Sequence, residues 1–181
     1  MQPFGVLISI IYERGKYSLE KTSSYKSQII EKYFDMIYHL ALTQVKNREN
    51  AEDIVQDVFL KYIQSNKDFE SEEHIKAWLI RVTVNCSKSL FTSSWFKKTI
   101  PLEDEFVFNT EEKSDVFYAV LELPLKYRAV IHLFYYEDMS IAEISDILKV
   151  KPATVKSQLS RGREMLRQKL KGGCENAFEI V

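Results

Sequence analysis

Apolar residues in this chain recur at intervals of three and four, which is the spacing of one face of an α-helix. The first segment with this spacing has one apolar face, which consists of Phe34, Ile37, Tyr38, Ala41 and Val45. Alternating apolar and polar residues, the pattern of a half-buried strand, are hard to find, and five Gly and four Pro leave long uninterrupted segments. The 181 residues have room for two small cores. We therefore predict an all-α fold of two small helical domains.

The composition argues against several classes of function. The 25 basic and 26 acidic residues nearly cancel, so attraction to a polyanion must come from a local patch. Cys86 and Cys174 are too few and too distant for a disulfide framework or a zinc site, and the three histidines are scattered. The apolar run at residues 6–11 is too short to span a membrane and lacks the features of a signal peptide. We expect a cytoplasmic protein without a metal, a cofactor or a membrane anchor.

A second helix is expected directly after the first. Residues 46–50 form a polar turn, and Asn50 is in a position to cap the helix. The apolar stripe of this helix consists of Ile54, Val55, Val58, Phe59 and Tyr62. On the opposite face Gln56 and Asp57 follow Asp53 by three and four residues, and together they form a small acidic and hydrogen-bonding ridge. Taken alone, this ridge is better explained as an ordinary solvated face than as a binding surface.

A third helix is predicted over residues 74–91. Its predicted core side chains are Ile75, Trp78, Leu79, Val82, Cys86 and Leu90. Arg81, Asn85 and Lys88 are left for the other faces. Further along, residues 101–115 carry six acids and one lysine with little periodicity, which predicts a flexible acidic linker between the two domains.

The segment from residue 139 to residue 170 is the most informative part of the chain. Ser140 and Glu143 match a helix-capping box, and the inner face of the helix that follows consists of Ile141, Ile144, Ile147 and Leu148. Residues 149–151 form a short turn, and Pro152 suits the first turn of another helix. The core side of that helix consists of Val155, Leu159, Met165 and Leu166. This pattern indicates a helix-turn-helix motif.

The second helix of this motif has a cationic outer face, because residues 152–170 hold five cations and one acid. Its outward side chains are Thr154, Lys156, Ser157, Gln158, Ser160, Arg161 and Arg163. Lys and Arg neutralise phosphates at any sequence, whereas Gln, Ser and a suitably placed Arg can read base edges in the major groove. We therefore predict a DNA-recognition helix; the alternative is an ordinary basic helix end.

Three stretches follow one another along the chain: "NRENAEDIVQDVFLKYI", "KAWLIRVTVNCSKSLF" and "LPLKYRAVIHLFYYEDMSIAEISDILKVKPATVKSQLSRGREML". They resemble regions 2.1 to 2.2, 2.3 to 2.4 and 4 of the extracytoplasmic-function (ECF, group 4) sigma factors of the sigma-70 family. The resemblance covers residues 28–171. One departure is Lys149, which stands at a turn position where the family usually has Gly.

The resemblance implies an alternative sigma factor that binds core RNA polymerase and promoter DNA, often under the control of an anti-sigma factor. It assigns the core-polymerase contact to Asp53, Gln56 and Asp57. It assigns the promoter's minus-ten element to Arg81, Asn85 and Lys88, with Asn85 reading an extruded base, and the minus-35 element to the recognition helix. The domains it implies are residues 1–24 (an extension of unknown role), 25–98 (region 2), 99–114 (the linker), 115–171 (region 4) and 172–181 (a tail).

Other classes of function remain as alternatives. A stand-alone helix-turn-helix regulator would bind duplex DNA without polymerase, usually as a dimer on a palindrome. A helical adaptor would have no DNA role at all. An enzyme is the least supported class, because no nucleophile, base or ligand cluster occurs at a meaningful spacing.

Overall fold

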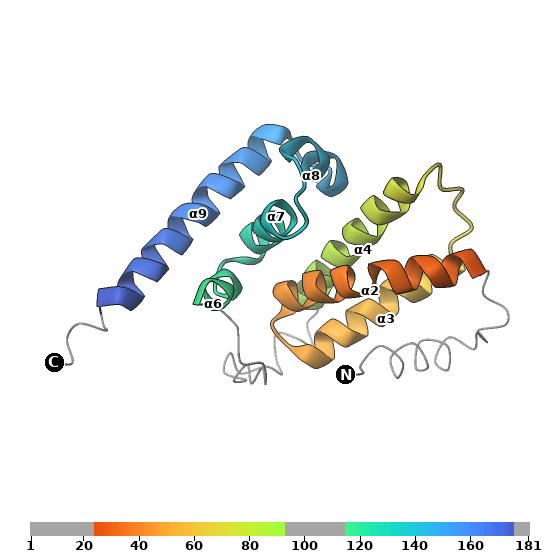
Figure 1. Ribbon diagram of the computed structural model, residues 1–181, viewed down its shortest axis with the longest axis horizontal. Coiled ribbons are helices and arrows are strands. Elements are labelled where there is room, and N and C mark those ends of the chain that lie inside the picture. Colours follow the sequence, from red (N-terminus) through yellow and green to blue (C-terminus); the bar gives the residue numbers. More distant parts are fainter. Residues whose placement is uncertain (1–23, 93–114, 176–181) are drawn as a thin grey trace. The chain divides into compact units, whose positions relative to one another are not determined.

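The computed structural model describes residues 24–92 and 115–175, and every regular element in these stretches is an α-helix (Figure 1). The chain divides into two compact units, Met1–Asp104 and Glu105–Val181. Their helices are α2 (Ser24–Val45), α3 (Arg48–Gln64) and α4 (Glu72–Thr92) in the first unit, and α6 (Asp115–Leu121), α7 (Leu125–Tyr135), α8 (Ile141–Leu148) and α9 (Pro152–Glu175) in the second. The predicted all-α fold is confirmed, while the predicted linker and both chain ends lie outside the described residues. None of the described helices has the length and hydrophobicity needed to cross a membrane.

The first unit is a bundle in which α2, α3 and α4 all pack on one another. The apolar stripes predicted for α2 and α3 form its core, except that Tyr38 is only half-buried. The rings of Phe34 and Phe59 stack with their centroids 6.2 Å apart, which joins α2 to α3. Glu72 links the first turn of α4 to α2, because its carboxylate accepts a hydrogen bond from the Tyr33 hydroxyl at 2.6 Å.

The turn between α2 and α3 is shorter than predicted. Lys46 has a left-handed backbone (φ 59°) and Asn47 an extended one (φ −139°), so the chain reverses within two residues. Asn47 is the N-cap, and its side-chain oxygen accepts a hydrogen bond from the N–H of Asn50 at 2.9 Å. The prediction that Asn50 caps the helix is therefore wrong. Asn50 is the third residue of α3, and its amide is the group that is capped.

The buried face of α4 is rotated from the predicted one. Its buried side chains are Ile75, Leu79, Ile80, Thr83, Val84 and Ser87. Four side chains that were predicted to lie in the core are only half-buried: Trp78, Val82, Cys86 and Leu90. The hydroxyls of Thr83 and Ser87 donate hydrogen bonds to carbonyl oxygens one turn earlier, at 2.8 and 2.9 Å. These bonds satisfy the two hydroxyls, so both residues can pack in the core.

In the second unit α9 packs against α6, α7 and α8. Val155 and Leu159 of α9 are buried as predicted. Gly162 is also buried, and a Cβ atom at this position would lie only 3.1 Å from Cγ1 of Ile131 on α7. The absence of a side chain at Gly162 therefore lets the two helices approach closely.

Candidate nucleic-acid and partner interfaces

The first candidate surface is a hollow of about 470 Å³ between α3 and α4. Asp53 and Asp57 on α3 line it and are exposed, as predicted. Gln56 also lines it, but only 8% of this residue is accessible, so the prediction of a fully solvated polar ridge is wrong for Gln56. The structure thus brings the three predicted residues to one hollow, where Gln56 is buried and the two aspartates are exposed.

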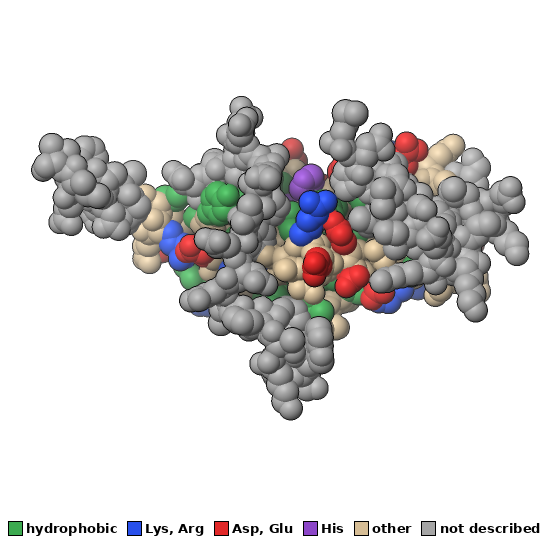
Figure 2. All heavy atoms as spheres, turned by 90° about the horizontal axis from the view of Figure 1, so that it is seen from below, with side chains coloured by type: hydrophobic (Ala, Val, Ile, Leu, Met, Phe, Trp, Pro, Cys, Tyr) green, Lys and Arg blue, Asp and Glu red, His purple; other side chains and the backbone are tan. Residues whose placement is uncertain are grey.

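The charges around this hollow are mixed. The ammonium of Lys61 lies 3.9 Å from the Asp57 carboxylate and donates a hydrogen bond to the Cys86 sulfur of α4 at 3.2 Å. Arg48 pairs with Glu52 at the start of α3. Seen from below, Asp and Glu side chains gather on one part of the described surface, with Lys or Arg side chains and a His nearby (Figure 2). A partner of this surface must therefore meet carboxylates that have nearby cations.

The second candidate surface is on α4. Arg81, Asn85 and Lys88 are separated by four and three residues, so they lie on one side of this helix. Asn85 and Lys88 are exposed and Arg81 is half-buried. Cys86, the residue after Asn85, lines the hollow described above, so the two candidate surfaces are neighbours on α4.

No group of His, Cys, Asp and Glu side chains in residues 24–92 or 115–175 could hold a metal ion.

The third candidate surface belongs to the helix-turn-helix formed by α8 and α9. The Ser140 hydroxyl accepts a hydrogen bond from the amide of Glu143, whose carboxylate accepts one from the amide of Ser140, so the predicted capping box is present. The turn after Leu148 and the start of α9 at Pro152 also agree with the prediction. Lys149 has a left-handed backbone (φ 54°, ψ 45°), a conformation that costs a residue with a Cβ about 1 to 2 kcal/mol.

Five of the seven side chains of α9 that were predicted to meet DNA are exposed: Lys156, Ser157, Ser160, Arg161 and Arg163. The other two, Thr154 and Gln158, are half-buried.

Aromatic residues of α7 contact two of these arginines. Arg161 donates a hydrogen bond to the Tyr127 hydroxyl and thereby lowers the pKa of that hydroxyl. The guanidinium carbon of Arg163 lies 5.7 Å from the ring centroid of Phe134 and 5.9 Å from that of Tyr135.

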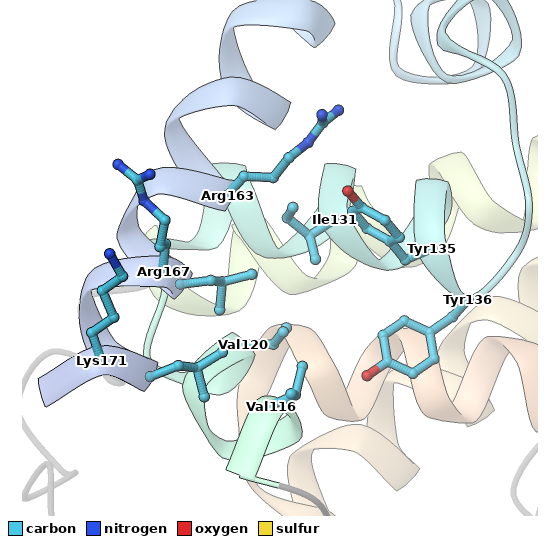
Figure 3. Close-up of a pocket in the computed structure, with 10 residues that line it drawn as sticks. Val116, Val120, Ile131, Tyr135, Tyr136, Arg163, Arg167 and Lys171 are labelled. Atoms are coloured by element: carbon cyan, nitrogen blue, oxygen red, sulfur yellow. The ribbon is translucent and has the colours of Figure 1, made fainter. Parts of the chain in front are cut away.

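An apolar groove of about 790 Å³ lies between α6, α7 and α9, and three cations lie along its α9 wall (Figure 3). These cations are Arg163, Arg167 and Lys171, at intervals of four residues. Sequence reasoning missed Arg167 and Lys171, although the four-residue spacing that continues from Arg163 was a detectable signal. Met165 and Leu166, predicted to face the core, are only half-buried, and Leu166 lines the groove.

Comparisons with known proteins bear on both units. The family model "Sigma-70 region 2" matches residues 29–96, and "Sigma-70, region 4" matches residues 115–166. RNA polymerase sigma factor SigV of Bacillus subtilis is 31% identical over 140 residues, which are 74% of this chain and 83% of SigV. ECF RNA polymerase sigma factor SigW of the same organism is 29% identical over 165 residues, covering 80% of this chain and 88% of SigW.

The chain belongs to the ECF group of the sigma-70 family. Among solved structures, this sigma factor is similar to the sigma factor RpoE in its complex with the anti-sigma factor NepR from Bartonella quintana. The TM-score is 0.68 at 23% identity, over 80% of this chain and 96% of that one, which supports a shared fold. In the sigma factor described here, α2, α3 and α4 lie mostly within the region 2 match, and α9 continues past the end of the region 4 match to Glu175.

Proposed function

We propose that this ECF sigma factor binds core RNA polymerase through the α3 side of region 2 and recognises promoters through α4 and α9. The main support for this proposal is that one chain matches the family models of both sigma-70 region 2 and sigma-70 region 4. In addition, the second helix of its helix-turn-helix exposes several cationic side chains. We assign region 2 to residues 25–98 and region 4 to residues 115–171, with residues 99–114 as the connector.

The proposed polymerase contact consists of Asp53, Gln56 and Asp57. Their support is twofold: the resemblance assigns this part of region 2 to the polymerase, and the three side chains line one hollow. The exposed carboxylates can accept charge-assisted hydrogen bonds, which are shorter and stronger than neutral ones. The buried amide of Gln56 would fix the position of the partner rather than supply charge.

The proposed promoter contacts divide between the two units. In region 2, Arg81 and Lys88 would bind phosphates of the opened minus-ten strand, while Asn85, which has both a donor and an acceptor, would read an extruded base. In region 4, the N-terminal half of α9 would lie in the major groove of the minus-35 element. Lys156 and Arg161 are the side chains with the length and charge to reach both phosphates and bases.

The family to which this chain belongs consists of regulators that recognise DNA. We propose that the protein has no catalytic residue of its own and that polymerase carries out the chemistry in the cytoplasm. The RpoE of the structural comparison is in complex with an anti-sigma factor. By that likeness we propose that a protein of the same kind controls this chain, by covering its polymerase or DNA surfaces.

The decisive experiment mixes the purified full-length chain with core RNA polymerase. We expect the two to co-elute, and we expect the complex to initiate transcription on a subset of a promoter library. Co-elution without initiation on any promoter would favour a polymerase-binding adaptor. Binding of the chain to duplex DNA without any association with polymerase would favour the stand-alone regulator.

Replacing Asn85 by alanine is expected to reduce initiation on the preferred promoter about 5- to 160-fold, because a lost base contact costs about 1 to 3 kcal/mol. The affinity for core polymerase should stay unchanged. The measurement is run-off transcription on promoters with each base at every minus-ten position. Gln64→Ala is the matched control, since Gln64 carries the same exposed amide on α3. An unchanged base preference in Asn85→Ala would remove Asn85 from the proposed reading site.

A further inference from the structure

The apolar groove between α6, α7 and α9 has no role in the proposed function. Figure 3 shows the side chains of α6 and α7 on one side of it and the cations of α9 on the other. Tyr136 is 52% exposed and Val116 45% exposed, although both are largely apolar. A continuous exposed apolar surface of this kind marks a place where another segment binds. Its apolar lining residues include Val116, Val120, Tyr135, Tyr136, Leu166 and Leu170.

The charge of the groove restricts what can occupy it. Arg163, Arg167 and Lys171 line its α9 wall, and no acid is among the described residues that line it. Arg163 already lies against aromatic rings of α7, and Arg167 is 2.8 Å from the Glu164 carboxylate. Lys171 is the cation of this wall nearest the end of α9. The groove therefore suits an apolar peptide that carries an acid on its α9 side.

The segment that follows α9 has this composition. Residues 176–181, here called the terminal segment, read Asn-Ala-Phe-Glu-Ile-Val and lie outside the described residues. Four of the six are apolar and one, Glu179, is an acid. The chain thus carries, directly after the helix that forms one wall of the groove, a peptide whose apolar and acidic side chains match it.

The length of the terminal segment fits the groove as well. The part of α9 that lines it runs from Arg163 to Lys171, which is about 12 Å at 1.5 Å per residue. Glu175, the last residue of α9, is four residues further on, or about 6 Å. Six extended residues span about 20 Å, so a segment that turns back at the end of α9 reaches along most of the groove. Gly172 and Gly173 weaken the last turns of α9, and glycine is the common residue where a helix ends and the chain turns.

We propose that the terminal segment folds back along α9 and docks in the apolar groove, with the Phe178 ring among the apolar side chains and Glu179 facing Lys171 and Arg167. Region 4 would then carry its own occupant in the free protein. A partner that uses this groove must displace the segment, so its apparent affinity falls in proportion to the fraction of time that the groove is open. The proposal concerns the free chain and does not depend on the proposed contacts with polymerase or DNA.

The first test compares the full-length protein with a variant that lacks residues 176–181, by methyl NMR at several protein concentrations. We expect the methyl signals of Val116 and Val120 to shift when the segment is removed. In the full-length protein we expect a nuclear Overhauser contact between the Phe178 ring and at least one of these methyl groups. Val55 and Val58 are the reference signals and should not shift, because they are buried in the other compact unit.

Point variants of the full-length protein separate docking from an effect on the end of α9. Phe178→Ala should reproduce most of the shift, because it removes the anchoring ring and leaves α9 intact. Asn176→Ala is the matched control, since it truncates a polar side chain of the same segment and should leave the signals of Val116 and Val120 in place.

A variant of the groove tests the same contact from the other side. Val116→Lys places a charge in the groove, and the fold should tolerate it because Val116 is nearly half exposed. The backbone order parameters of Phe178 and Ile180 should then fall from about 0.85, the value of a rigid backbone, to below about 0.6.

Several outcomes would overturn the proposal. Unchanged signals of Val116 and Val120 after removal of the segment would do so, as would an equal shift in Asn176→Ala. Signals that change only with protein concentration would assign the groove to a second copy of the chain, and signals that change only when core polymerase is added would assign it to polymerase. Because the test uses the chain alone, its failure would leave the co-elution with core polymerase unaffected.

Discussion

Replacing Asp53 and Asp57 together by lysine is expected to weaken the association with core RNA polymerase about a hundredfold. Removing one partner of a close interfacial charge pair costs about 2 to 5 kcal/mol, and a hundredfold loss corresponds to about 2.8 kcal/mol. The two lysines would also repel cations of the partner surface. The measurement is the dissociation constant of labelled variant and core polymerase at low and at physiological salt.

The folded state should tolerate this change. Asp53 and Asp57 are exposed, and the pair between Asp57 and Lys61 is a surface ion pair, which contributes at most about 1 kcal/mol. Glu31→Lys together with Asp35→Lys is the control, because both are exposed acids on α2 and the total change of charge is the same. Equal affinities for the double variant and the control would show that the α3 face is not the polymerase contact.

Replacing Phe59 by alanine is expected to lower the free energy of unfolding of the first unit by about 3 to 5 kcal/mol. Phe59 has no accessible surface, and its ring stacks on Phe34, so alanine leaves a cavity between α2 and α3. Because the helices form two separate compact units, the second unit should keep its stability. Chemical denaturation followed by near-ultraviolet circular dichroism and by heteronuclear NMR would report the two units separately.

A complementary variant tests the same independence from the other side. Leu133 is fully buried on α7, and Leu133→Ala should destabilise the second unit alone, by about 2 to 5 kcal/mol. If Phe59→Ala prevents folding altogether, Phe59→Leu provides a milder change at the same position. A shift of both units by either variant would mean that the chain unfolds as one cooperative body.

The caps and the turn of the helix-turn-helix were predictable from sequence, whereas four of its predicted core side chains are only half-buried: Ile141, Leu148, Met165 and Leu166. Its capping box, its three-residue turn and the start of α9 at Pro152 follow from local rules that act over three or four residues. The left-handed backbone of Lys149 was indicated only by the resemblance, because the family usually has Gly at this turn position; the structure shows that the turn is kept with a lysine in it.

The first unit was less predictable because its errors involve polar side chains that bond to nearby backbone. Asn47 caps α3 in place of Asn50, and Thr83 and Ser87 enter the core through hydrogen bonds to their own helix. A pattern of apolar spacing does not register such residues. Gln56 was likewise assigned to solvent by its type, although only a small part of it is accessible in the folded unit.

The functional assignments had a different origin. The residues alone indicated DNA binding by α9, but for the α3 ridge they favoured an ordinary solvated surface. The proposed roles in binding polymerase and the minus-ten element came from the resemblance. These roles depend on the structures of polymerase and promoter DNA, which the sequence of this chain does not describe. Arg167 and Lys171 continue the four-residue spacing from Arg163, but they lie beyond the part of α9 that the helix-turn-helix pattern predicts to meet DNA.

The two arginines held by α7 have a consequence for the thermodynamics of promoter binding. A free arginine side chain loses up to about 2 kcal/mol of rotamer entropy when it is fixed. Tyr127 restrains Arg161, and Phe134 and Tyr135 restrain Arg163, before any DNA arrives. Much of this ordering therefore takes place when region 4 folds, and the proposed DNA contacts of Arg161 and Arg163 would depend on the integrity of these aromatic residues of α7.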